Sequence, residues 1–199
     1  METANNEQKI LIALLKSVNK SQTVTSIAQE LQISRVGAWK LLKRLEAENI
    51  LLLAPIGSGK TNAFTISLNW DNSLTQKHLE LALCIEAEKQ QRWKDSFASL
   101  GKSADFMVLY GSITHSPKEA NDIDILVVAP VKQHADIDKK MLTVQKTQLK
   151  KIHGIIFTET ELKLELLKPN SAFVDALTKG IVLAGQENFI KFVKSLHTI

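Results

Sequence analysis

The chain has 199 residues, of which 44% are hydrophobic and 23% are charged. These values are typical of a soluble globular protein and exclude a disordered, collagen-like or disulfide-stapled chain. The longest apolar runs, residues 50–54 and 125–129, are far shorter than the roughly 18 residues of a membrane span, and the first thirty residues show no signal peptide. Cys84, the single cysteine, lies between apolar neighbours, which predicts a buried structural thiol. We therefore expect a cytoplasmic protein without a membrane partner.

The net charge of +4 says little about partners, but two basic clusters stand out. Residues 34–44 contain four basic side chains and no acidic one, and residues 139–151 contain five lysines and no acid. Such a cluster is most often a solvated helix face. Less often it binds nucleic acid.

The first seventy residues predict three helices followed by a hairpin. Apolar residues at helical spacing predict helices over residues 7–18, 25–31 and 34–49, with Thr25 or Ser26 capping the second and Ser34 capping the third. The expected buried stripe of the third helix consists of Ala38, Leu41, Leu42 and Leu45. Strands are expected at 50–54 and 64–68, with a turn over 55–60 between them. Together these elements predict a winged helix-turn-helix.

The rest of the chain alternates between helices and strands. Residues 73–100 predict one connecting helix that ends near Gly101. Strands are expected at 106–110, 123–128 and 152–157, and a short turn or strand at 180–185. Further helices are expected at 134–150, 160–167, from 174 to 177, and at 187–196.

The third helix has the chemistry of a DNA recognition helix. In a helix-turn-helix, the exposed N-terminal residues of this helix meet bases and phosphates in the major groove. We expect Ser34, Arg35 and Lys40 to contact DNA, with Arg44 and the wing-tip Lys60 meeting phosphate.

The string SRVGAWKLLKRLEAENI resembles the winged helices of biotin-repressor-type regulators, over about residues 8–68. The resemblance implies DNA binding, although winged helices also serve as protein–protein platforms. Within this string, Trp39 is expected to support the helix rather than to contact bases.

Residues 54–61, APIGSGKT, match a Walker A phosphate loop except that Ala54 replaces the first glycine. That loop requires a helix directly after it, so that the helix N-terminus holds phosphate. The residues that follow alternate like a strand and include the β-branched Thr65 and Ile66. The glycines are therefore interpreted as the turn of the wing.

The most informative stretch runs from Leu109 to Val128. Asp122 and Asp124 alternate with apolar residues on a predicted strand, so both carboxylates face one side. Two converging carboxylates suit Mg²⁺ (or Mn²⁺), which in turn holds nucleotide phosphates. Gly111 and Ser112 follow the preceding strand directly and allow close approach of those phosphates.

This arrangement resembles the minimal members of the DNA polymerase β-type nucleotidyltransferase superfamily, over about residues 100–199. The resemblance implies that Gly111 and Ser112 bind the triphosphate of an NTP, and that Asp122 and Asp124 act as catalytic metal ligands. Small archaeal and bacterial proteins that couple a winged helix to such a domain have a similar ending.

Three departures from the family pattern weaken the expectation of activity. The spacer between Ser112 and Asp122 has nine residues rather than ten. His115 stands where the family has a phosphate-facing arginine. A third carboxylate, which deprotonates the attacking hydroxyl, is missing from residues 152–157, where His153 is the one ionisable side chain. A surface histidine is the simpler interpretation of His153, and a general base the bolder one.

The expected fold is a two-domain α/β protein. It comprises a winged helix-turn-helix over residues 1–72, a linking helix over 73–100, and a nucleotidyltransferase-type mixed sheet with helices over 101–199. Three functions compete: an active transferase, such as the toxin–antitoxin enzymes that modify a partner protein; a transcriptional regulator with a degenerate, nucleotide-sensing domain; and an interaction module with neither activity. A homodimer is expected from the habit of winged helices.

Overall fold

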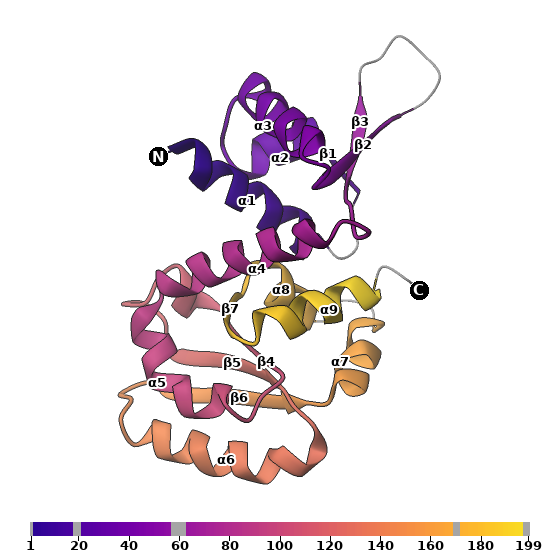
Figure 1. Cartoon of the computed structure of the whole chain (residues 1–199). Coiled ribbons are helices and arrows are strands. Elements are labelled where there is room, and N and C mark those ends of the chain that lie inside the picture. Colours follow the sequence, from indigo (N-terminus) through magenta and orange to yellow (C-terminus); the bar gives the residue numbers. More distant parts are fainter. Residues whose placement is uncertain (1, 18–20, 57–62, 169–171, 197–199) are drawn as a thin grey trace. The chain divides into compact units, whose positions relative to one another are not determined.

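The computed structural model describes residues 2–17, 21–56, 63–168 and 172–196. It is a mixed α/β structure, as expected, and it contains a three-stranded and a four-stranded sheet (Figure 1). The chain divides into two compact units, Met1–Ala82 and Leu83–Ile199. No described helix combines the length and the apolar character that crossing a bilayer requires.

The first unit contains the three expected helices and the expected hairpin. The helices are α1 (Glu2–Lys16), α2 (Val24–Glu30) and α3 (Arg35–Ala47). Strands β2 (Leu51–Pro55) and β3 (Phe64–Leu68) pair antiparallel. The predicted stripe of α3 is buried: Ala38, Leu41, Leu42 and Leu45. Ser34 caps α3, because its side chain accepts a hydrogen bond from the Gly37 amide.

The start of α2 differs from the prediction. The helix begins at Val24, and its N-cap is Thr23, rather than Thr25 or Ser26. The reason is a short strand, β1 (Gln22–Thr23), which pairs with β3 and keeps the chain extended up to the cap. Ser26 instead completes a capping box by accepting a hydrogen bond from the Thr23 amide.

The stretch that resembles a phosphate loop lies within the β2–β3 hairpin. Residues 57–62, including Lys60, lie outside the described part of the chain. On either side, β2 and β3 are in register from Leu51–Leu68 to Pro55–Phe64. Because a strand follows where a phosphate loop requires a helix, the interpretation as a hairpin is confirmed.

The predicted single helix over 73–100 is in fact two helices, α4 (Ser73–Glu88) and α5 (Gln91–Gly101). Gln90 departs from helical geometry, with φ −111° and ψ 37°. A straight helix over this span would be about 42 Å long, whereas the longest strands, of seven residues, span roughly 23 Å. The break lets the buried side of α5, which includes Phe97, pack within the core of the sheet.

Cys84, predicted to be buried, is only partly so. It lies on α4 beside Leu83, which is fully buried and takes the core position.

The second unit is built on a four-stranded sheet in the order β6-β5-β4-β7. Its strands are β4 (Phe106–Tyr110), β5 (Asp122–Val128), β6 (Lys151–Phe157) and β7 (Ile181–Ala184). β4 pairs antiparallel with β5 and β7, and β5 pairs parallel with β6. A parallel pair needs a crossover, which α6 (Val131–Gln145) supplies.

Helix α6 lies earlier in the chain than the predicted 134–150. It begins directly after Pro130, whose fixed φ and missing amide suit a helix start. After the last turn, the Gln145 side chain binds the Lys150 carbonyl and the Ile152 amide, and so ties the chain to β6. The remaining helices are α7 (Glu159–Leu166), α8 (Ala172–Lys179) and α9 (Gln186–Leu196).

The two faces of the sheet differ. One face contributes alternate apolar residues, such as Ile123 and Ile125, to a core that includes side chains of α5 and α6. The other face is apolar at one end, where Phe106 of β4 packs on Phe189 and Phe192 of α9. Its opposite end, at the start of β5 and β6, is polar and partly exposed, and this end holds the site.

Candidate metal and nucleotide site

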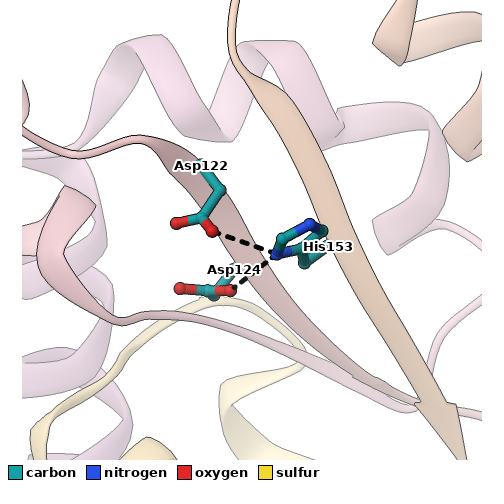
Figure 2. Close-up of side chains that lie close together, drawn as sticks. All are labelled: Asp122, Asp124 and His153. Carbon is teal, nitrogen blue, oxygen red and sulfur yellow. Dashed lines mark ion pairs between the residues drawn. The ribbon is translucent and has the colours of Figure 1, made fainter.

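The two predicted carboxylates lie together at the start of β5. Asp122 and Asp124 are partly exposed, whereas Ile123 between them is buried. This alternation follows from the two-residue period of a strand. The core side of β5 is therefore anchored by apolar residues, and both carboxylates face the opposite side (Figure 2).

His153 joins these carboxylates from the neighbouring strand. In the parallel pairing of β5 with β6, His153 lies opposite Asp124, and Lys151 lies opposite Asp122. The His153 Nδ1 atom is 3.1 Å from Asp122 Oδ2 and 3.8 Å from Asp124 Oδ1. Dashed lines in Figure 2 mark these two ion pairs. One potential ligand atom from each of the three side chains lies within 4.8 Å of the others.

The negative charges of Asp122 and Asp124 repel each other at the start of β5. Burial raises the pKa of Asp124, the negative charge of Asp122 raises it further, and His153 opposes both effects. Tyr110, opposite Asp124 on β4, has a raised pKa because it is partly buried and faces the two aspartates. A cation placed between the carboxylates would relieve this repulsion.

Gly111 has a conformation and a position that only glycine fits. Its φ of 76° and ψ of −167° lie in a region that other residues avoid. A Cβ at this position would lie 2.2 Å from Asp124 Oδ2. Gly111 therefore permits both the turn out of β4 and the approach of the carboxylate to the backbone.

Ser112 opens a short 3-10 helix, Ser112–Thr114, directly after this glycine. The turn is held by the Thr114 hydroxyl, which donates to the Gly111 carbonyl at 2.8 Å. Ser112 itself is exposed, so that its hydroxyl is accessible to a ligand.

A pocket of about 260 Å³ adjoins this turn. Gly111 and Ser112 line it, as does His115, the residue that replaces the expected arginine. From α8 come Asp175 and Lys179, whose side chains form an ion pair of 2.9 Å. Sequence reasoning missed Lys179, because nothing local to residue 179 indicates that α8 lies beside a turn at residue 112.

The donor set suits a divalent cation. Two carboxylates supply hard oxygen ligands, and the site has the partial exposure that exchange with water requires. Strand β6 carries no carboxylate, and His153 is the residue that pairs with Asp124.

The predicted DNA-contacting residues of α3 fall into two groups. Ser34, Arg35 and Lys40 are exposed, and within the described residues neither Arg35 nor Lys40 forms an ion pair. Arg44 is exposed but pairs with Glu7 of α1, which offsets its charge. Lys60 lies outside the described residues.

Trp39 supports the packing of α3, as expected. Its ring packs on Phe64 of β3, with centroids 5.2 Å apart, and the Lys43 ammonium lies 5.5 Å from its centroid. These rings help to line an apolar pocket of about 470 Å³, to which Arg35 contributes a charge.

We compared the chain with models of protein families, with curated proteins and with solved structures, and none of them matched.

Proposed function

We propose that the second unit is a nucleotidyltransferase-type domain that binds a divalent metal ion together with a nucleoside triphosphate. The observation that carries the proposal is the convergence of Asp122, Asp124 and His153 next to Gly111. A nucleotide site needs carboxylates for the metal and an accessible backbone turn for phosphate, and these two features adjoin here.

Each residue has a distinct task in this proposal. Asp122 and Asp124 hold the metal, which offsets the negative charge of the phosphates during in-line displacement. Gly111 leaves room for phosphate oxygens, and the Ser112 hydroxyl donates a hydrogen bond to them. Lys179 is close enough to this turn to add a positive charge, once a phosphate competes with Asp175.

We propose further that the acceptor is a hydroxyl group, on a partner protein for example, and that turnover in the isolated chain is slow. A positioned general base typically contributes about 10²–10⁴-fold to such a step. On β6, His153 is the ionisable side chain that lies beside both aspartates of β5. The resemblance to active transferases implies a carboxylate on this strand instead.

For the first unit we propose a winged helix that binds DNA, which makes the chain a two-domain protein. The support is that Arg35 and Lys40 of α3 are exposed, whereas the stripe of this helix that packs in the core is apolar. A homodimer would place two such helices at successive half-sites.

A second function, a transcriptional regulator that senses nucleotide through a degenerate site, is favoured by the missing third carboxylate. It differs from the first in requiring energetic coupling. If nucleotide binding changes DNA affinity, then DNA must change nucleotide affinity by the same factor.

The test is to incubate the whole chain with labelled NTPs and Mg²⁺, with and without the product of the neighbouring gene. The matched control is Asp122→Asn with Asp124→Asn. We expect Mg²⁺-dependent NTP binding that the double variant loses, with little labelled product. Equal NTP binding by the two proteins in calorimetry would refute the proposed nucleotide site, whereas rapid labelling by the wild type would refute slow turnover.

A further inference from the structure

Asp122 and Asp124 would offer oxygen atoms to a metal ion, whereas His153 would offer a nitrogen atom. Metal ions differ in their preference for nitrogen ligands. His153 is placed by the pairing of β6 with β5, which sets its side chain on the same side of the sheet as Asp124. Its side chain is 46% exposed. The imidazole therefore lies on the same face of the sheet as the carboxylates and is accessible to an ion.

The three ligand atoms lie within 4.8 Å of one another, which is near the spacing around a single ion. Ligand atoms about 2.1 Å from a metal lie roughly 3.0 Å apart at right angles and about 3.4 Å apart in a tetrahedron. The His153 Nδ1 atom lies 3.1 Å from one aspartate oxygen and 3.8 Å from the other. An ion between the three atoms could bind all of them after small side-chain adjustments.

The chemistry of the donors separates the candidate ions. Mg²⁺ prefers oxygen ligands and keeps much of its water, whereas imidazole nitrogen is a good ligand for Zn²⁺ and related first-row ions. We propose that this site selects a borderline transition-metal ion, Zn²⁺ or Co²⁺, over Mg²⁺, with His153 Nδ1 as the third protein ligand. The inference rests on the proposed function in that it uses the same two aspartates, but it does not require nucleotide transfer.

The charge balance of such a site also favours an anionic ligand. With two carboxylates and an imidazole, the site and its divalent ion together carry no net charge. With three carboxylates, the same site would carry a net negative charge. Three protein ligands leave further coordination positions open, as in catalytic zinc sites. Phosphate oxygens from the side of Gly111 and Ser112 could take these positions.

The experiment is a titration of the whole chain, without a histidine tag, with Co²⁺ alone, followed by visible absorption. Zn²⁺ and Mg²⁺ are then added as competitors. We expect saturable Co²⁺ bands that Zn²⁺ removes at near-equal concentration and that Mg²⁺ removes only in large excess. In His153→Ala, Co²⁺ affinity should fall by more than the roughly 10–100-fold that follows the loss of an outer-shell partner, while Mg²⁺ affinity is unchanged.

Two further variants sharpen the comparison. His78→Ala removes an exposed histidine of the first unit that is outside the metal group, and it should leave Co²⁺ affinity unchanged. His153→Asp replaces nitrogen by oxygen, and it should reverse the preference towards Mg²⁺. Thermal unfolding followed by circular dichroism checks that each variant is folded.

Unchanged Co²⁺ affinity in His153→Ala, or displacement of Co²⁺ by equimolar Mg²⁺, would overturn the inference. Neither result would affect the proposed function, which is tested separately by Mg²⁺-dependent NTP binding in the variant that lacks both aspartates. Conversely, histidine-dependent Co²⁺ binding without NTP binding would support the metal site and refute nucleotide binding.

Discussion

Gly111 decides how closely the Asp124 carboxylate approaches the turn after β4. Because its φ is positive and a Cβ would collide with Asp124 Oδ2, the position rejects any side chain for two independent reasons. We expect Gly111→Ala to lower the free energy of unfolding by about 1–3 kcal/mol and to weaken metal binding by moving Asp124. Denaturant unfolding and Co²⁺ titration would measure the two effects, and an alanine variant with wild-type stability would contradict the argument.

Asp124 is in an environment that disfavours its charge. Its pKa is raised in the folded chain, so the charged form costs stability at neutral pH, and this cost disappears as the pH falls through the raised pKa. With EDTA present at pH 7, Asp124→Asn should therefore be more stable than the wild type, by less than about 1 kcal/mol, since the side chain is partly exposed.

Metal should reverse this order of stability. A ligand that binds the folded chain stabilises it, and the wild type should gain more than Asp124→Asn on addition of Co²⁺. Asp138→Asn, on the exposed side of α6, is the control, and its free energy of unfolding should equal that of the wild type both with EDTA and with Co²⁺. A loss of stability for Asp124→Asn in EDTA would mean that the carboxylate has a structural task, such as holding His153.

At the scale of an element, β6 carries His153, to which we attribute the slow turnover proposed for this chain. His153 lies opposite Asp124, and Ile155, two residues later, lies opposite Leu126 in the same pairing. We expect His153→Asp to raise nucleotidyl transfer, since it restores a carboxylate beside the metal ligands. The matched variant Ile155→Asp should not, because Leu126 is buried in the sheet. Equal labelling by both variants would contradict the proposed geometry.

Helix α3 is the element that we expect to contact DNA, through its exposed side chains. Because Arg35 and Lys40 form no ion pair within the described residues, their charges are available to phosphates. Lys40→Ala should weaken binding to all sequences and lower the slope of log K against log salt by about one. Gel shifts at several salt concentrations would measure this, with Lys132→Ala on α6 as the control. An unchanged slope would favour the protein–protein platform.

For the whole molecule, the proposed DNA site and the proposed nucleotide site belong to different compact units, each with its own sheet. The variant Arg35→Ala with Lys40→Ala should lose DNA binding but keep Mg²⁺-dependent NTP binding. The variant that lacks both aspartates should show the opposite pattern. Calorimetry and gel shifts on the same preparations would measure both. Loss of both activities in either variant would mean that the units do not fold or act separately.

Coupling between the sites distinguishes the two proposed functions. For a transferase, DNA affinity should be the same with and without Mg²⁺–NTP. For a nucleotide-sensing regulator, the two affinities should differ by a factor of about 5–150, the usual range of allosteric coupling. Gel shifts with and without nucleotide would measure the factor.

The sequence by itself determined the features that depend on local periodicity. Alternation along β5 places Asp122 and Asp124 on one face, and helical spacing predicts the buried stripe of α3. The Ser34 cap and the antiparallel pairing of β2 with β3 were also predictable, since a cap and a hairpin involve residues close in the sequence.

Only the tertiary structure decided what lies next to these carboxylates. His153 is 29 positions beyond Asp124, and its place depends on the register of a parallel pair, which is set by burial of Ile123 and Ile152 on the opposite face. Lys179 reaches the turn at Ser112 because α8 and β4 pack together. Such contacts depend on how distant apolar surfaces pack, which no local pattern encodes.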